Sequence, residues 1–311
     1  MNINCWEFHF VILCVFPGAC KIVHLLCMPC IARFLSIFGV FDFERANTIR
    51  EHKVSRVKSE LVALQETLYT SRNPTRMWLH TSRRDWVNNA LKICASSRTV
   101  KRSIEVGPGA GGYLPLLSGL SEQVIAADIE QEYLEYALDI ASDLKNVQCT
   151  TDDITRSSLP AGAFDLVLCT EVIEHIADSP SALAGLRRLL SPGGRLVLST
   201  PQRYSPLEIC SKVAFLPGVI ELVRLIYREP IIPTGHINLL TEKELKLQLD
   251  NAGLVILEQF KCGLYLPVVA EAMGRVGLKI EQWLEERLRD SRLDWLLWTQ
   301  CYVLKAKDAD A

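Results

Sequence analysis

The stretch Ser103–Leu117 reads SIEVGPGAGGYLPLL, a short apolar run followed by four glycines and a segment able to begin a helix. Gly107, Gly109 and Gly112 satisfy the spacing G-x-G-x-x-G, while Gly107, Gly109 and Gly111 satisfy G-x-G-x-G. Both patterns place glycine where the backbone must come close to a ligand that leaves no room for a side chain. The first is typical of loops that bring a pyrophosphate to a helix N-terminus. The glycines therefore predict a ligand-binding turn and leave its ligand open.

Strand-like and helix-like segments alternate around this turn. We expect strands near residues 102–108, 123–129, 147–154, 164–172, 193–201, 254–262 and 295–306, and helices near 113–120, 130–144, 181–190, 241–253 and 268–290. Pro115 fits the first of these helices only within its first turn. The alternation predicts an α/β fold, with a parallel sheet covered by helices on both faces.

Residues 204–238 interrupt the alternation with an apolar segment punctuated by prolines. The segment follows the fifth expected strand, at the edge where open α/β sheets bind ligands. We expect one or two short helices there, which would form a lid over the site.

The chain before residue 99 divides into two parts. Residues 1–42 are apolar but are broken by Lys21 and Arg33, whereas a spanning helix needs about 20 uninterrupted apolar residues. The segment is interpreted as a membrane or interfacial anchor, as an apolar element packed on the main domain, or as an extension outside that domain. Residues 43–98 have the spacing of helices, one of them near Asn73–Cys94. Its arginines are expected on the solvated side of the helix, or as a patch for an acidic substrate or lipid headgroup: Arg72, Arg76, Arg83 and Arg84.

Composition excludes some classes of function. The formal net charge is −2 and no basic block is present, so no nucleic-acid partner is expected. Scattered cysteines are typical of a reducing compartment, which favours a cytoplasmic protein. Cys27 and Cys30 form a C-x-x-C, but no second pair follows at zinc spacing, so no metal site is predicted.

Three carboxylates stand near the ends of the first three expected strands. Glu105 lies two residues before Gly107, where it can accept hydrogen bonds from the turn or hold the ammonium group of a ligand. Asp128 lies about 20 residues after the loop, an offset that suits a carboxylate on ribose hydroxyls. Asp153 can accept a hydrogen bond from an adenine amino group, or it can cap a turn. Asp152 can share or take over the adenine contact. The charge of Glu105 favours a ligand with an ammonium group over a pyrophosphate.

The chain resembles the class I S-adenosylmethionine-dependent methyltransferases in five stretches that stand in the family's order: IEVGPGAGGY, AADIEQEYLEYA, TTDDI, FDLVLCTEVIEHIADSPSALAGLRRLLSPGGRLVLSTP and GHINLLTEKELKLQLDNAGL. They cover roughly residues 101–253. EVIEHI followed by L-x-P-G-G resembles the ubiquinone-biosynthesis-type small-molecule methyltransferases. The resemblance implies a methyltransferase domain over residues 99–306. Its fold would be Rossmann-like and doubly wound, a mostly parallel seven-stranded sheet with an antiparallel last strand, a helical N-terminal extension and a helical lid after strand five.

The resemblance also implies S-adenosyl-L-methionine as the cofactor. It assigns the methionine part to Glu105, Gly107, Gly109 and Gly111, the ribose to Asp128, the adenine to Asp153, and the surroundings of the sulfonium to Thr170 and Glu171. Asp152 departs from the family, in which glycine is usual at that position, and this puts the adenine contact in doubt.

Methyl transfer from a sulfonium depends largely on placing the nucleophile and the methyl group in line. A base is needed only when the acceptor must lose a proton, as a hydroxyl does. His175, after the fourth strand, and His236, at the end of the lid, are the candidate catalytic bases, with a structural role as the alternative for each. Glu174 can orient one of them or begin a helix.

The apolar lid and N-terminus indicate a small, lipophilic acceptor such as a quinone precursor, a polyketide or a lipid, methylated on O or C. Alternatively, the apolar lid residues simply pack on the sheet edge. Two other functions compete: an NAD(P)-dependent Rossmann oxidoreductase, which gives no reason for EVIEHI, and a non-catalytic partner with the methyltransferase fold. A cytoplasmic location is expected, with possible membrane association through residues 1–42.

Overall fold

The computed structural model describes residues 71, 73–216, 218, 220–221 and 235–307. The chain divides into two units, Met1–Leu61 and Val62–Ala311, and every described residue lies in the second. The expectations for residues 1–42, for the helix before residue 71, for Arg72 and for lid residues 222–234 fall outside the described residues.

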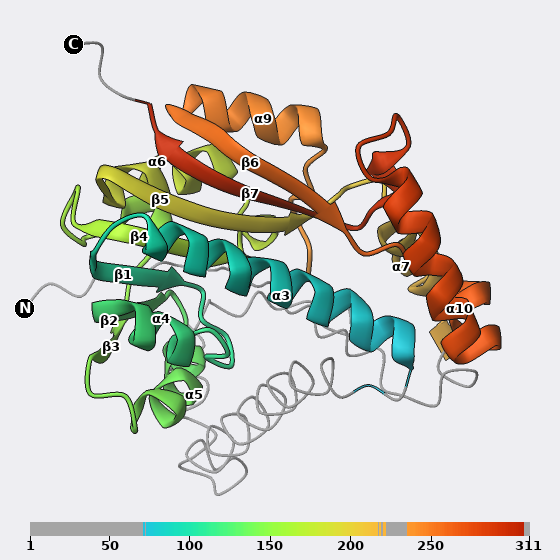
Figure 1. Ribbon diagram of the computed structural model, residues 1–311, viewed down its shortest axis with the longest axis horizontal. Coiled ribbons are helices and arrows are strands. Elements are labelled where there is room, and N and C mark those ends of the chain that lie inside the picture. Colours follow the sequence, from blue (N-terminus) through green and yellow to red (C-terminus); the bar gives the residue numbers. More distant parts are fainter. Residues whose placement is uncertain (1–70, 72, 217, 219, 222–234, 308–311) are drawn as a thin grey trace, which may run out of the picture. The chain divides into compact units, whose positions relative to one another are not determined.

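Seven strands form one sheet in the order β3-β2-β1-β4-β5-β7-β6 (Figure 1). The five strands that pair in parallel are β1 (Val100–Val106), β2 (Ser121–Asp128), β3 (Val147–Thr151), β4 (Phe164–Thr170) and β5 (Leu190–Pro201). β7 (Thr299–Ala306) lies antiparallel between β5 and β6 (Leu254–Cys262). The predicted seven-stranded, mostly parallel sheet with an antiparallel last strand is confirmed.

Helices cover both faces of this sheet. One face carries α3 (Pro74–Ser96), α4 (Leu114–Leu120) and α5 (Gln131–Ala141), and the other carries α6 (Ser179–Leu189) and α9 (Glu242–Asn251). Pro115 lies within the first turn of α4, as expected. Each face has its own apolar core, and fully buried leucines such as Leu91 in one and Leu183 in the other each stabilise the fold by about 2 kcal/mol. Because both faces are covered, β4 is apolar along most of its length rather than alternating.

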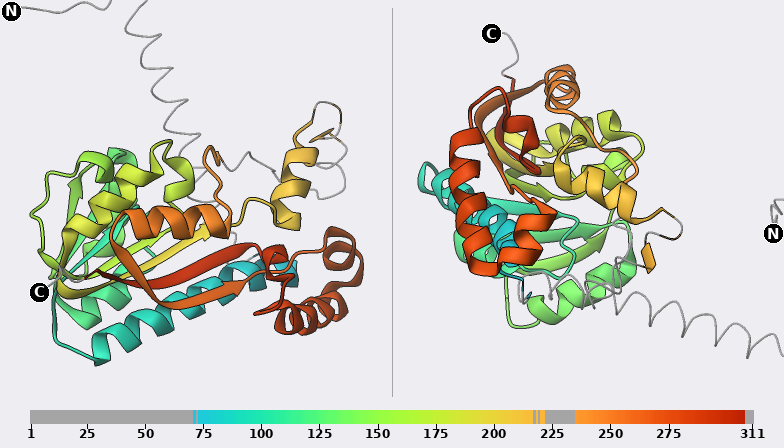
Figure 2. Two further views of the ribbon diagram at one scale, coloured as in Figure 1. Left: turned by 90° about the horizontal axis from the view of Figure 1, so that it is seen from above. Right: turned by 90° about the vertical axis from the view of Figure 1, so that its right-hand side faces the viewer.

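Two further helices lie beyond the carboxyl ends of the parallel strands (Figure 2). α7 (Pro206–Ala214) follows β5 and is capped by Ser205, whose Oγ accepts from the N–H of Glu208. This is the short helix expected at the start of the lid. α10 (Pro267–Leu288) connects β6 to β7 and is interrupted at Gly274, where φ is 49°. Among the described helices, none is long and apolar enough to cross a membrane.

Three single-turn 3-10 helices complete the described fold. They are η1 (Ile154–Arg156) after β3, η2 (Ile173–His175) after β4 and η3 (Asp294–Leu296) before β7. η1 and η2 therefore follow the carboxyl ends of parallel strands, the side of the sheet on which the site is expected.

The expectation that Arg83 lies on the solvated side of its helix is wrong. Arg83 is buried in α3, on the same stripe as Leu79 and Val87. These residues are four positions apart, so they share one helix face. The expectation followed side-chain charge, whereas the spacing places Arg83 with the core residues.

Gly185 of α6 packs against η1, and an alanine at this position tests the contact. An added Cβ would stand 1.9 Å from the carbonyl oxygen of Ile154. We expect Gly185→Ala to lower the free energy of unfolding by about 1–3 kcal/mol, measured by chemical denaturation. Gly119 of α4 is the matched control, because nothing lies within 4 Å of its added Cβ. Gly119→Ala should be neutral or stabilise by up to about 1 kcal/mol, and equal losses in both variants would contradict the packing described.

Candidate active site

The loop after β1 has the backbone conformation that its glycines predict. Gly107, Gly109 and Gly111 have φ of 71°, 51° and 72°, a region that other residues rarely adopt. An added Cβ on Gly107 would stand 2.4 Å from Cγ2 of Val172, which follows β4. The N–H of Gly107 donates to the carbonyl of Ala127 at 2.8 Å. The turn is therefore closely packed between the ends of β2 and β4.

Glu105 lies beneath this turn as a buried carboxyl group. It is 1% exposed, and its Oε2 has no hydrogen-bond partner among the described residues. Burial raises the pKa of Glu105 well above its ordinary value. Because a buried acceptor without a donor is destabilising, this position fits a ligand that supplies a positively charged donor. The ammonium group of S-adenosylmethionine is such a donor, so the loop and Glu105 together fit the predicted cofactor.

Asp128 ends β2 at the same edge of the sheet. It is half-buried, and burial raises the pKa of its carboxyl group. The carboxylate Oδ1 accepts from the N–H of Glu130 at 2.9 Å. Its place agrees with the ribose contact that the sequence predicts, and that contact stays a prediction.

Asp153 uses its carboxylate within the chain. Oδ1 accepts from the N–H of Thr155 at 3.0 Å and from its hydroxyl at 2.7 Å, and Oδ2 accepts from Nε of Arg156 at 2.8 Å. These contacts cap η1, the alternative that the sequence left open. Oδ1 of Asp152 accepts from the N–H of Ser158. Both carboxylates therefore accept hydrogen bonds within the loop after β3, and the adenine contact stays a prediction.

Thr170 ends β4, and the next residue, Glu171, has a strained backbone with φ of 55°. A bulky residue in this region costs about 1–3 kcal/mol and persists only where its surroundings hold it. Glu171 Oε1 accepts from Oγ of Ser199 at 2.8 Å, and Oε2 pairs with Nη1 of Arg83 at 2.9 Å. Such strain is common at functional sites, and here β5 and α3 both fix the turn.

The pKa of the buried Cys169 thiol is affected by several acidic side chains of the site. Burial raises the pKa of Cys169, and the charges of Glu174, Glu105 and Glu171 raise it further. Carboxyl groups on β1, on the turn after β4 and on η2 therefore all act on one buried thiol. Since such a thiol is inert, Cys169 has a packing role.

The two candidate bases lie side by side, with ring centroids 5.3 Å apart. Nδ1 of His175 lies 3.2 Å from the carbonyl oxygen of Gly235, which can only accept, so Nδ1 carries the hydrogen. Burial lowers the pKa of His175, and neighbouring His236 lowers it further. The N–H groups of Ile237 and Asn238 donate to the backbone oxygen of Glu174, which fastens the segment after His236 to η2.

Glu208 is a site residue that the sequence analysis missed. Its carboxylate is buried on α7, lies 3.2 and 3.3 Å from Nδ1 of His236, and accepts from Nε1 of Trp298 at 2.9 Å. A carboxylate accepts only, so Nδ1 of His236 donates and Nε2 is left able to accept a proton. The only sequence signal is an acidic residue in the first turn of a helix, which is usually explained by the helix dipole.

Glu174, His175 and His236 also form a group that could hold a metal ion. Each offers one ligand atom, and these atoms lie within 4.8 Å of one another. Oε2 of Glu174 accepts from the Thr200 hydroxyl at 3.0 Å, while Oε1 has no hydrogen-bond partner among the described residues. Imidazole and carboxylate are donor types that divalent transition metals accept. The metal-free site expected from the sequence stays a prediction.

Comparison with known proteins agrees with the fold. A family model described as a methyltransferase domain matches residues 78–259. A ubiquinone biosynthesis O-methyltransferase of Xanthomonas oryzae pv. oryzae is 28% identical over 193 residues, which cover 59% of this chain and 73% of that protein. An uncharacterized 37.1 kDa protein in a Streptomyces fradiae transposon is 35% identical over 108 residues, but this match covers 34% of the chain and 31% of that protein. The structure of N-methyltransferase NodS from Bradyrhizobium japonicum, in complex with S-adenosyl-L-homocysteine, has a similar fold, with a TM-score of 0.51, 16% identity, and coverage of 81% of this chain and 97% of that one.

Replacing Glu105 by glutamine should have opposite effects on stability and on cofactor binding. The folded-state pKa of Glu105 is raised, so its contribution to stability is present below the unfolded pKa and is lost as pH rises through the folded pKa. At pH 8 cofactor-free Glu105→Gln should therefore melt at a higher temperature than the wild type. Loss of a charged hydrogen bond should also weaken S-adenosylmethionine binding by about 10-fold or more in calorimetry. Exposed Glu122→Gln is the control and should change neither the melting temperature nor the affinity for S-adenosylmethionine. Lower stability of Glu105→Gln with unchanged affinity would refute the assignment of Glu105 to the ammonium group.

Proposed function

Because the chain belongs to the methyltransferase-domain family and is an S-adenosylmethionine-dependent methyltransferase, we propose that it methylates a hydroxyl oxygen of a small, lipophilic acceptor. Membership of the methyltransferase-domain family confirms the prediction of a methyltransferase over those of an NAD(P)-dependent oxidoreductase and of a non-catalytic partner. The observation that carries the proposal is the pairing of Glu208 with His236 beside the carboxyl ends of the strands. A positioned base is needed for a hydroxyl acceptor, which must lose its proton. The name of the similar Xanthomonas protein, an O-methyltransferase, supports oxygen as the acceptor atom.

The cofactor contacts form the first part of the proposal. Glu105 pairs with the ammonium group, the loop of Gly107, Gly109 and Gly111 surrounds the methionine part, and Asp128 binds the ribose hydroxyls. Thr170 and Glu171 lie beside the sulfonium, and Asp153, or Asp152 in its place, contacts the adenine. When bound, the cofactor supplies an electrophilic methyl group on a sulfonium.

The proton transfer is assigned to His236. Nδ1–H of His236 donates to Glu208, which fixes the tautomer and the ring orientation. Nε2 would accept the hydroxyl proton as the acceptor oxygen bonds to the methyl carbon and the carbon–sulfur bond breaks, which would leave the sulfur as a neutral thioether. The Glu208 carboxylate stabilises the imidazolium that results, by the same logic that orients histidine in catalytic triads. A positioned base of this kind contributes about 10²–10⁴-fold to the rate.

His175 is the second candidate base, with a different environment. Its lowered pKa keeps the ring neutral, and Nδ1 is engaged with Gly235. In the part of the chain that the structure describes, no carboxylate hydrogen-bonds to the His175 ring to stabilise an imidazolium, in contrast to His236. We therefore assign His175 to binding and orienting the acceptor hydroxyl, with a smaller effect on the rate.

The outer surface of α7 supports a lipophilic acceptor. Ile209 and Val213 lie one turn apart on this helix, Leu216 follows its end, and their exposed fractions are 46%, 51% and 52%. Exposed apolar side chains gathered on one helix are typical of surfaces that bind an apolar ligand or a membrane. An acceptor with an apolar part could lie along this face while its hydroxyl group reaches His236.

The proposal is tested by comparing the metabolites of cells that express three forms of the full chain. The wild type should produce a compound about 14 Da heavier than its precursor, the mass of one CH₂, and methyl-deuterated methionine should add three further mass units, as transfer of one intact methyl group requires. Asp128→Ala, designed to lose the cofactor, should produce none of it. His236→Gln should reduce the amount by about 10²-fold or more, since it lacks the base.

Two outcomes would contradict this account. A methylated product formed equally by wild type and His236→Gln would remove His236 as the base. A product that proves to be methylated on carbon or nitrogen would refute the hydroxyl acceptor while leaving the methyltransferase activity intact.

A cytoplasmic enzyme held at a membrane by residues 1–42 is part of the same proposal, because a lipophilic acceptor is concentrated there. Deletion of residues 1–42 should move the protein from the membrane pellet to the supernatant in cell fractionation. Equal pelleting of the full chain and the truncated chain would contradict the anchor.

A further inference from the structure

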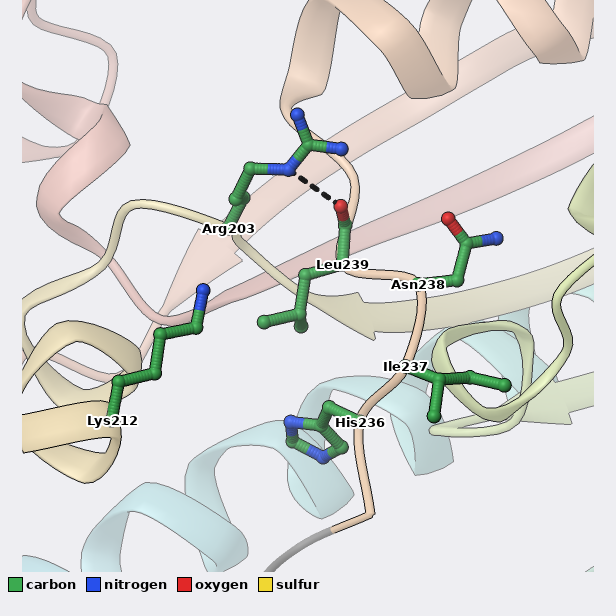
Figure 3. Close-up of a pocket in the computed structure, with 6 residues that line it drawn as sticks. All are labelled: Arg203, Lys212, His236, Ile237, Asn238 and Leu239. Carbon is green, nitrogen blue, oxygen red and sulfur yellow. Dashed lines mark hydrogen bonds between the residues drawn. The ribbon is translucent and has the colours of Figure 1, made fainter. Parts of the chain in front are cut away.

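A cavity of about 200 Å³ opens beside His236. It lies between the end of β5, α7 and the segment that leads to α9 (Figure 3). The described residues that line it are Arg203, Lys212, His236, Ile237, Asn238 and Leu239. Since His236 is the proposed base, this cavity is placed to hold a part of the acceptor that does not react.

Arg203 is fixed in the wall of this cavity. Its Nε donates to the carbonyl oxygen of Leu239 at 2.7 Å (Figure 3). Its Nη1 pairs with Oε1 of Glu244 at 2.8 Å. The capping box of α9 holds Glu244 in place through Thr241. The guanidinium group is therefore held in one orientation, with its charge partly offset by Glu244.

Lys212 supplies a positive charge that pairs with no carboxylate of the described residues. It is exposed on α7 and makes no hydrogen bond or ion pair with any described residue. Lys246 and Lys261, by contrast, both pair with Glu242. Glu208 and Glu244, the carboxylates that contact lining residues, are already engaged, Glu208 by His236 and Trp298, and Glu244 by Arg203. Among the described residues that line the cavity, two are cationic, Arg203 and Lys212, and none is acidic.

We propose that this cavity binds an anionic group of the acceptor, a carboxylate or a phosphate, through Lys212 with Arg203 in its wall. A concave site lined by charge of one sign concentrates ligands of the opposite sign, and the ammonium group of lysine binds carboxylate and phosphate as a point charge. This inference rests on the proposed function, since it takes His236 as the reacting end of the site. The acceptor is then amphiphilic, with its anionic group at Lys212 and its apolar part along Ile209 and Val213.

Three small probes test the charge preference without knowledge of the natural acceptor. Benzoate, phenyl phosphate and neutral benzamide are titrated into the full chain loaded with S-adenosyl-L-homocysteine, and binding is measured by ligand-observed NMR. The wild type should bind one or both anions about 10-fold or more tightly than benzamide, a typical effect of one charged contact. Lys212→Met should abolish this difference. Lys243→Met, which removes an exposed lysine of α9 outside the cavity, should retain it.

Equal binding of the anions and benzamide by the wild type, or no binding of any probe, would overturn the proposal. So would a charge preference that Lys212→Met leaves intact. The more tightly bound anion identifies carboxylate or phosphate as the group recognised. His236→Gln keeps the cavity's cations and should keep the preference, so a failure of the anion site can be told apart from a failure of the proposed base.

Discussion

The buried carboxylate of Glu208 joins three parts of the chain at one point. It lies on α7, accepts from the indole of Trp298 just before β7, and contacts the ring of His236 in the segment before α9. A buried carboxylate is stable only where hydrogen-bond donors satisfy it. These donors come from segments that are distant in sequence, so the site forms only when the sheet edge and α7 are both in place. The orientation of His236, and with it the proposed chemistry, depends on this contact.

A second constraint connects α3 to the same edge of the sheet. Arg83 pairs with Glu171, whose left-handed backbone would otherwise be unfavourable. Arg83 also lies over the ring of Trp298, 5.7 Å from its centroid, and Trp298 in turn donates to Glu208. The helix that precedes the sheet thus contributes directly to the site. Because these contacts connect one residue to the next, a substitution of Arg83 in α3 should alter the turn after β4.

Much of the fold follows from the sequence because its signals are local. The alternation of strands and helices, the glycine turn after β1 and the place of Pro115 depend on residues close together in the chain, and all three agree with the structure. Arg83 and Glu208 were missed because their roles come from partners 88 and 28 positions away. Asp153 illustrates the converse, since its capping of η1 is a local contact that competes with the cofactor contact implied by resemblance. Long-range pairs of charged residues leave no periodic pattern from which they could be recognised.

The orientation of His236 by Glu208 can be observed directly in the protein without any acceptor. Long-range proton–nitrogen NMR of the histidine side chains distinguishes the two neutral tautomers. At a pH where the ring is neutral, the account predicts that His236 carries its hydrogen on Nδ1 and that Glu208→Gln weakens this preference. A neutral His236 with its hydrogen on Nε2 could not accept the substrate proton at that nitrogen and would contradict the central claim.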